Sequence, residues 1–195
     1  MKRRIKIQGF LIFLATIALI FFAKYLFADV WRGRAEWYRD ILGLTMIFWG
    51  FFLRILARGY KAEINPDGKR LVTDGPYALT RNPMYFGTLV IGLGIMSVLF
   101  KWWVALVFLA VYLMIYNLEI NREEAKLLGS FGDKYKDYCR KTAKFFPHPR
   151  SWLIARQGRH LYLKMPWVKK ELPSLIMTVV FVIGLKIWLI ARSPR

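Results

Sequence analysis

The 195-residue chain combines 56% hydrophobic residues with a formal net charge of +19. A soluble domain of this length cannot bury so many apolar side chains, and nucleic-acid-binding proteins are not usually so apolar. Both facts fit a membrane protein with basic cytosolic surfaces, so we expect anionic membrane lipids as partners and no nucleic acid. A single cysteine excludes an intramolecular disulfide, and with only two histidines beside it we expect no metal site.

Two long apolar runs open the chain. The basic cluster Met1 to Lys6 precedes an apolar run from Ile7 to Ala28. This run is longer than the hydrophobic part of a secretory signal peptide, and no clear cleavage site follows it, so it predicts a first transmembrane helix. Ile41 to Leu56 predicts a second transmembrane helix, with Arg54 and Arg58 at its exit.

A helical hairpin is predicted after the polar segment Gly59 to Arg81. Pro83 to Phe100 and Trp102 to Asn117 are apolar and are separated only by Lys101. Pro83 is expected in the first turn of its helix, where its missing N–H costs no hydrogen bond. Both arms are short for a straight span, so we expect them to pack together and the second arm to continue beyond the bilayer.

The last part of the chain predicts three further elements. A charged helix is expected from Glu119 to Leu128, with Gly129 as its C-terminal cap. His148 to Lys170 mixes aromatic and basic residues, as segments lying on a membrane surface do. Leu172 to Ala191 predicts a last span, which either closes one side of the helix bundle or only anchors the segment before it.

The distribution of basic residues predicts the orientation in the membrane. Placing the N-terminus, residues 54–81 and residues 122–170 on one side collects 23 of the 31 lysines and arginines there. That side is therefore expected to be cytosolic. We predict an all-α fold, a single-domain polytopic bundle of about five transmembrane helices over residues 1–195. The oligomeric state is not indicated.

Two polar segments flank the predicted hairpin on its cytosolic side. One is the loop from Gly75 to Tyr85, in which two prolines impose bends. The other is the charged helix, where Glu119 and Glu123 share one face and repel each other unless a cation lies between them. Antiparallel geometry brings the two segments together. The glutamates form either a solvated stripe neutralised by Arg122 and Lys126 or a site for a cation.

The same two segments carry the motifs of a known family. Gly75-Pro76-Tyr77, followed by Arg81-Asn82-Pro83-Met84-Tyr85, resembles the Gly-Pro-Tyr and Arg-His/Asn-Pro-x-Tyr motifs of the isoprenylcysteine carboxyl methyltransferase and phospholipid N-methyltransferase superfamily. A second block is also similar to the family: Glu123-Glu124, Phe131-Gly132, Tyr135, Tyr138 and Phe145-Phe146-Pro147. The resemblance covers residues 71–149.

The resemblance implies an integral-membrane methyltransferase that uses S-adenosylmethionine and has a cytosolic cofactor-binding helix and loop. Arg81 suits the cofactor carboxylate, the glutamates suit its ammonium or ribose, and tyrosine rings suit its sulfonium cation. The cofactor-binding residues expected from this resemblance are Gly75, Pro76, Tyr77, Arg81, Asn82, Pro83, Tyr85, Glu123 and Glu124.

The methyl acceptor is expected to be a lipid or a lipid-modified molecule that arrives from the bilayer. A carboxylate acceptor needs a cationic clamp, such as Arg122 or Arg140, whereas an amine needs a base, such as Glu119 or Tyr116. Glu119, Arg122 and Tyr116 are therefore the catalytic candidates. Asn82 stands where the carboxyl methyltransferase branch usually has histidine, and Asn-Pro occurs in the phospholipid branch, so a lipid amine has comparable weight.

Two other functions remain open from the sequence. One is an NADPH-dependent oxidoreductase similar to sterol reductases, which have a comparable C-terminal helical core. The other is a non-enzymatic membrane protein that binds anionic lipids through its basic residues. Binding of S-adenosylmethionine rather than NADPH separates the methyltransferase from the first alternative.

Overall fold

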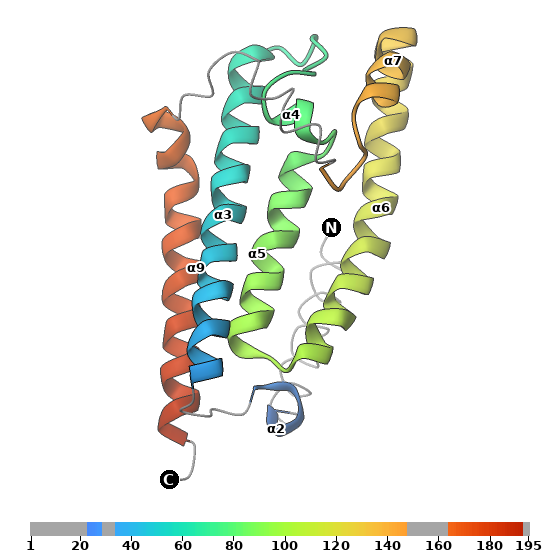
Figure 1. The fold of residues 1–195 in the computed structure, drawn as a ribbon. Coiled ribbons are helices and arrows are strands. Elements are labelled where there is room, and N and C mark those ends of the chain that lie inside the picture. The colour runs from blue at the N-terminus through green and yellow to red at the C-terminus, as the bar shows by residue number, and fades with distance from the viewer. Residues whose placement is uncertain (1–22, 29–33, 148–163, 193–195) are drawn as a thin grey trace, which may run out of the picture.

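The computed structural model describes residues 23–28, 34–147 and 164–192 (Figure 1). Apart from one isolated antiparallel bridge between Phe27 and Phe100, the regular structure of these residues is helical. The described helices are α2 (Ala23–Leu26), α3 (Arg34–Ile64), α4 (Pro76–Leu79), α5 (Pro83–Leu99), α6 (Trp102–Phe131), α7 (Asp133–Lys141) and α9 (Met165–Arg192).

Three of the described helices are long and apolar enough to cross a membrane: Glu36–Ile64, Trp102–Phe131 and Met165–Ala191. The chain is thus a multi-pass membrane protein, and three of the predicted spans lie within these helices. Helix α5 is also apolar but has only 17 residues. Most of the predicted first span, Ile7 to Ala28, lies outside the described residues, so the total of five spans stays a prediction.

Helices α3 and α5 run antiparallel and approach each other through glycines. A Cβ added to Gly43 would lie 2.8 Å from the carbonyl oxygen of Gly94, and one added to Gly50 would lie 2.7 Å from that of Gly87. The reverse distances, from a Cβ on Gly94 and on Gly87, are 2.6 and 2.8 Å. Because no side chain separates the backbones, the two helices pack closely, as small residues allow in membranes.

The predicted hairpin is confirmed by α5 and α6, which are joined through Phe100 and Lys101. Pro83 is the first residue of α5, as expected for a proline in a first helical turn. Helix α6 continues for 30 residues, about 45 Å, and so extends past the first residue of α5 (Figure 1). This difference in length places the second half of α6 beside the loop that precedes α5.

The predicted end of α6 at Gly129 is wrong. The helix continues through Gly129 to Phe131, and Gly132 is its cap. Gly132 has a φ of 52°, and its N–H donates to the carbonyl oxygen of Leu128 at 2.8 Å. A positive φ favours glycine, and this conformation occurs three residues later than predicted.

Helix α9 begins earlier than predicted. We expected residues up to Lys170 to lie on the membrane surface and the span to begin at Leu172, but one helix runs from Met165 through Pro173. Residues 148–163 of the predicted surface segment lie outside the described residues. The early start is explained by Glu171, which is 2% exposed and accepts a hydrogen bond from Arg58 at 2.5 Å. A paired charge can lie inside the helix interface, so it does not mark the end of the helix.

Helix α9 packs against α3 and α5 rather than α6. Near its start, the ring of Trp167 fills the space that a side chain at Gly59 would need. Near its other end, Lys186 Nζ lies 2.7 Å from Glu36 and 3.2 Å from Asp40. Contacts at both ends thus attach α9 to α3, on the side away from α6 (Figure 1).

Candidate functional site

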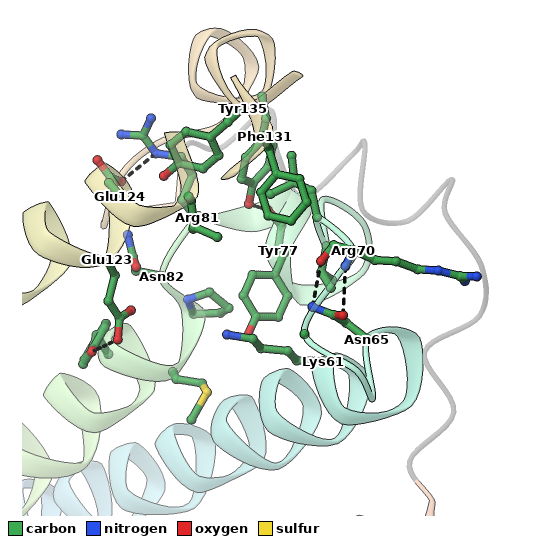
Figure 2. A pocket seen from close by; sticks show the side chains of 18 residues that line it. Lys61, Asn65, Arg70, Tyr77, Arg81, Asn82, Glu123, Glu124, Phe131 and Tyr135 are labelled. Carbon is green, nitrogen blue, oxygen red and sulfur yellow. Dashed lines mark hydrogen bonds and ion pairs between the residues drawn. The ribbon is translucent and has the colours of Figure 1, made fainter. Parts of the chain in front are cut away.

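A cavity of about 420 Å³ lies where α4, α7 and the neighbouring ends of α3, α5 and α6 meet (Figure 2). Its volume is within the roughly 300–1,000 Å³ typical of small-molecule sites. Of the described residues that line it, none belongs to α9. The lining residues are Lys61, Asn65, Gly68, Arg70, Leu71, Val72, Tyr77, Arg81, Asn82, Pro83, Met84, Tyr85, Glu123, Glu124, Leu127, Phe131, Tyr135 and Tyr138.

The charged wall of the cavity joins the loop before α5 to helix α6. Arg81 Nε lies 3.2 Å from Glu124 Oε1, and the two side chains are only 13% and 19% exposed. Neither of these two atoms has a well-aligned hydrogen bond to another described group, although both are buried. Buried charged groups without full hydrogen bonding are costly, so this pair has capacity to bind polar groups of a ligand.

A second contact joins the first turn of α5 to α6. The Tyr85 hydroxyl donates a hydrogen bond to Glu123 Oε1 at 2.8 Å (Figure 2). Glu123 and Glu124 are adjacent on α6, so they reach different parts of the cavity wall. The sequence-based expectation that the loop and the glutamate helix lie together is confirmed, and Glu119 is not part of this contact.

The opposite wall is formed by the end of α3 and the loop after it. Asn65 orders this loop, since its Nδ2 donates to the Arg70 carbonyl oxygen at 2.7 Å and its Oδ1 accepts from the Arg70 N–H at 3.0 Å. Figure 2 shows Lys61, Asn65 and Arg70 facing the Arg81 and Glu124 side across Tyr77. The cavity is therefore polar on two sides.

Gly75 and Pro76 shape the loop without lining the cavity. Gly75 has a φ of 60°, and the ring of Tyr60 lies where its Cβ would point, at 3.0 Å. Pro76 starts the single turn of α4. This turn brings Tyr77 onto a small core that includes Ala57 and Val72. The Gly-Pro pair thus positions Tyr77.

Asn82 is held by the segment that follows α7. It is buried, and its Nδ2 donates to the Lys144 carbonyl oxygen at 2.9 Å. Two residues earlier, Thr80 Oγ1 lies within 3.3 Å of the Ala143 carbonyl oxygen, and the Arg81 N–H donates to that oxygen at 2.9 Å. The Asn82 amide makes its neutral contact to Lys144 without a protonation step, as the sequence suggested. The motif is therefore fixed by the chain after α7.

Three buried tyrosines close the cavity and stay protonated at neutral pH. Burial raises the pKa of Tyr77 above its ordinary range, and the charge of Glu123 raises it further. Burial also raises the pKa of Tyr135 and of Tyr138. The Tyr138 hydroxyl donates to the Tyr77 carbonyl oxygen at 2.6 Å, which ties α7 to α4. These phenols are hydrogen-bond donors, not bases.

The three catalytic candidates lie outside the cavity lining. Glu119 and Arg122 pair with each other at 3.4 Å, and their side chains are 49% and 74% exposed. This arrangement matches the solvated stripe that the sequence left open for Glu119. Tyr116 is closer to the site, since its ring centroid lies 5.2 Å from that of Tyr85. Arg140, the other clamp considered, pairs with Asp137 at 3.4 Å on the surface.

Several lining residues were not among the predicted site residues. Lys61, Asn65 and Arg70 come from the end of α3 and its loop, where only a turn signal was visible in the sequence. Tyr135 and Tyr138 were recognised as part of the second motif block but were given no role. Their spacing of three on an amphipathic helix places both rings on one face, which was the available signal.

Comparison with known proteins places this site in a family. Residues 38–134 match the family model described as phospholipid methyltransferase. This part of the chain belongs to that family. The matched region contains α4, α5, α6, most of α3, and the charged wall of the cavity. Tyr135 and Tyr138 follow directly after it.

Curated relatives have two kinds of names. A protein-S-isoprenylcysteine O-methyltransferase of Schizosaccharomyces pombe is 38% identical over 77 residues, 40% of this chain and 33% of the relative. A nickel-cobalt-cadmium resistance protein of Alcaligenes xylosoxydans xylosoxydans is 31% identical over 149 residues, 75% of this chain and 65% of the relative. A cobalt-zinc-cadmium resistance protein of Cupriavidus metallidurans is 35% identical over 121 residues.

The alignments span from a third to about two thirds of the length of these relatives. The family match identifies a methyltransferase-like membrane protein. The family includes enzymes that use S-adenosylmethionine. No solved structure matches the chain significantly.

Proposed function

We propose that this protein transfers a methyl group from S-adenosylmethionine to a lipid or lipid-modified acceptor at the membrane. The observation that supports the proposal best is the convergence of Arg81, Glu123 and Glu124 on one cavity within the family region. The three charged side chains come from two elements that the hairpin brings together. A structural ion pair alone would not require an open volume beside it.

The charges and hydrogen-bonding groups of the residues present suit the cofactor. Arg81 has guanidinium nitrogens beyond its contact with Glu124 and can bind a carboxylate. Glu123 can accept hydrogen bonds from an ammonium or a ribose hydroxyl, and the ring of Tyr85 presents a π face to a cation. When bound, S-adenosylmethionine supplies a methyl group on a sulfonium cation. Because Tyr77 keeps its proton, it can serve as a donor to a polar edge.

Methyl transfer depends mainly on holding the acceptor in line with the methyl group, so the chain needs rigid walls around the acceptor. Tyr85 and Tyr116 provide aromatic walls between the cavity and the membrane-embedded part of α6. A carboxylate acceptor needs no base, whereas an amine acceptor must lose a proton to water, to Tyr116 or to a carboxylate. Both classes of acceptor remain within the proposal.

Ligand binding and methyl incorporation test the proposal together. The purified full chain in detergent is titrated with S-adenosylhomocysteine and with NADPH, and radiolabelled S-adenosylmethionine is incubated with membranes containing the protein. We expect S-adenosylhomocysteine to bind and label to enter the lipid fraction or base-labile esters. Binding of NADPH with no binding of S-adenosylhomocysteine would overturn the proposal in favour of the oxidoreductase.

The names of two relatives raise metal resistance as another role. Among the residues that the structure describes, no group of three or more His, Cys, Asp or Glu side chains is arranged to hold a metal ion. A direct metal site is therefore not part of the proposal. A basic protein that binds anionic lipids without catalysis would retain its function after Arg81→Ala, which gives a second test.

A further inference from the structure

A smaller cavity of about 190 Å³ lies beside the candidate site, nearer the middle of α6. It is lined by Leu113, Tyr116, Asn117, Ile120, Lys144 and Phe145. Leu113 lies three and four positions before Tyr116 and Asn117, and Ile120 lies four and three after them, so these α6 residues share one face of the helix. Glu124 and Leu127 continue this face into the larger cavity. The two cavities therefore follow one stripe of α6.

Lys144 places a positive charge in the smaller cavity. Its Nζ lies 2.6 Å from Asn117 Oδ1 and 2.6 Å from Asn121 Oδ1. An ammonium group has three N–H donors, and the two amides use two of them. Among the described residues, no carboxylate forms an ion pair with Lys144. The ammonium is thus held in place by two neutral oxygens and has one N–H donor left for a ligand.

Lys144 lies beside Asn117 of α6, at the level expected for the edge of the membrane. Asn117 ends the apolar run that begins at Trp102, and the charged part of α6 follows. A lipid headgroup lies at this level, with its acyl chains beside the apolar part of the helix. Exposed apolar side chains on that part of α6, such as Met114 and Ile115, are suited to contact acyl chains.

Aromatic rings connect the two cavities. Tyr116 lines the smaller cavity, and its ring lies 5.2 Å from that of Tyr85, which lines the larger one. Tyr112 stacks on Tyr116 at 4.1 Å and lies 6.4 Å from Phe145. An anion at Lys144 is therefore separated by an aromatic side chain from the cavity that suits the cofactor.

We infer that Lys144, Asn117 and Asn121 form a subsite for the phosphodiester of a phospholipid acceptor. The inference rests on the proposed function and specifies how the acceptor is held. In an aminophospholipid the phosphate and the amine are separated by a short linker, so the phosphate can lie at Lys144 while the amine reaches past Tyr116. A carboxylate acceptor would have to react at the position of its own charge, which does not match an anion site set apart from the larger cavity.

Equilibrium binding to the purified full chain in detergent tests this subsite. The probes are short-chain dihexanoyl phosphatidylethanolamine, S-farnesyl-N-acetylcysteine as a carboxylate, and inorganic phosphate. We expect Lys144→Met to weaken phosphatidylethanolamine binding about tenfold or more, since charge-assisted contacts are strong. Lys126→Met, which removes an exposed charge from α6, is expected to change this binding less than about twofold.

Two further measurements keep the test independent of folding and of the proposed function. S-adenosylhomocysteine affinity should be unchanged in Lys144→Met, and Lys144→Arg should restore most of the lipid affinity. If the wild-type chain does not bind S-adenosylhomocysteine, the proposed function fails, while the lipid titration still decides the subsite. Equal phosphatidylethanolamine binding by wild type and Lys144→Met would overturn the inference. Loss of only the carboxylate probe, or equally tight binding of inorganic phosphate, would also overturn it.

Discussion

Tyr85 and Glu123, 38 positions apart in sequence, are joined by a hydrogen bond of 2.8 Å. The contact links the first turn of α5 to the second half of α6. It exists because α6 extends beyond its partner in the hairpin and carries Glu123 past the membrane edge. This part of the cavity wall therefore depends on the length of α6.

The first prediction concerns the charge on this wall. Glu123→Gln should weaken S-adenosylhomocysteine binding by about tenfold, because a charge-assisted hydrogen bond to the ligand becomes a neutral one. Isothermal titration on the purified protein measures the change. Asp133→Asn is the control, since the Asp133 side chain is 91% exposed and lies outside the cavity lining. Unchanged affinity in Glu123→Gln would remove Glu123 from the cofactor site.

The second prediction concerns the hydrogen bond that joins α7 to α4. Tyr138→Phe removes the donor to the Tyr77 carbonyl oxygen and should lower the free energy of unfolding by about 1–3 kcal/mol. Tyr38→Phe, at a hydroxyl-bearing side chain that is 72% exposed, should change it little. Thermal unfolding in detergent measures both. An unchanged melting temperature for Tyr138→Phe would contradict the role of this bond.

The same tyrosine predicts a dependence on alkaline pH. Its pKa is raised in the folded protein, so the unfolded chain loses the phenolic proton first, near its ordinary pKa of about 10. Stability from Tyr138 is therefore fully present below pH 10 and is lost as the pH rises above it. The difference in stability between wild type and Tyr138→Phe should narrow above pH 10. A difference that stays constant up to pH 11 would contradict the raised pKa.

The third prediction tests the close approach of α3 and α5. Gly50→Ala places a methyl group 2.7 Å from the Gly87 carbonyl oxygen and should destabilise the protein by about 1–3 kcal/mol. Gly184→Ala is the matched control, because no atom lies within 4 Å of the added methyl group. Alanine at position 184 should stabilise helix α9 by about 0.5–1 kcal/mol. Similar melting temperatures for the two variants would exclude the backbone contact.

The fourth prediction concerns the buried carboxylate of α9. Glu171→Gln leaves Arg58 and Arg54 without their shared counter-charge and should lower the free energy of unfolding by about 1–3 kcal/mol. Solvent screening weakens this ion pair because the Arg58 side chain is 55% exposed. Glu63→Gln, which breaks an exposed pair with Lys164, should cost less than about 1 kcal/mol. Equal melting temperatures for the two variants would show that the ion pairs of Glu171 do not stabilise the packing of α9 on α3.

The helices that carry the site were predicted from short stretches of sequence. Pro83 predicted the start of α5 because proline is favoured in the first turn of a helix, and two apolar runs with almost no linker predicted the hairpin around Lys101. These features depend on neighbouring residues alone. The proximity of the loop and the glutamate helix then followed from antiparallel geometry, and the contacts of Tyr85 and Arg81 with α6 confirm it.

Features that depend on distant partners were not predictable. Glu171 resembled the polar boundary of a membrane span, because its partner Arg58 is 113 positions away in the sequence. Lys144 likewise resembled one of many basic surface residues, because its partners Asn117 and Asn121 are 27 and 23 positions away in the sequence. A charge can be interpreted only when its partners are known. Such partners lie across helix interfaces, where sequence spacing carries no information.

The glycine pairs between α3 and α5 also fix the axial register of these helices. Gly43 and Gly50 oppose Gly94 and Gly87 with the same seven-residue repeat on both helices, so a slide by one turn would force larger side chains against a backbone. The register decides how far the start of α5 lies from the end of α3. The height of the cavity above the membrane is therefore determined by four residues that have no side chain.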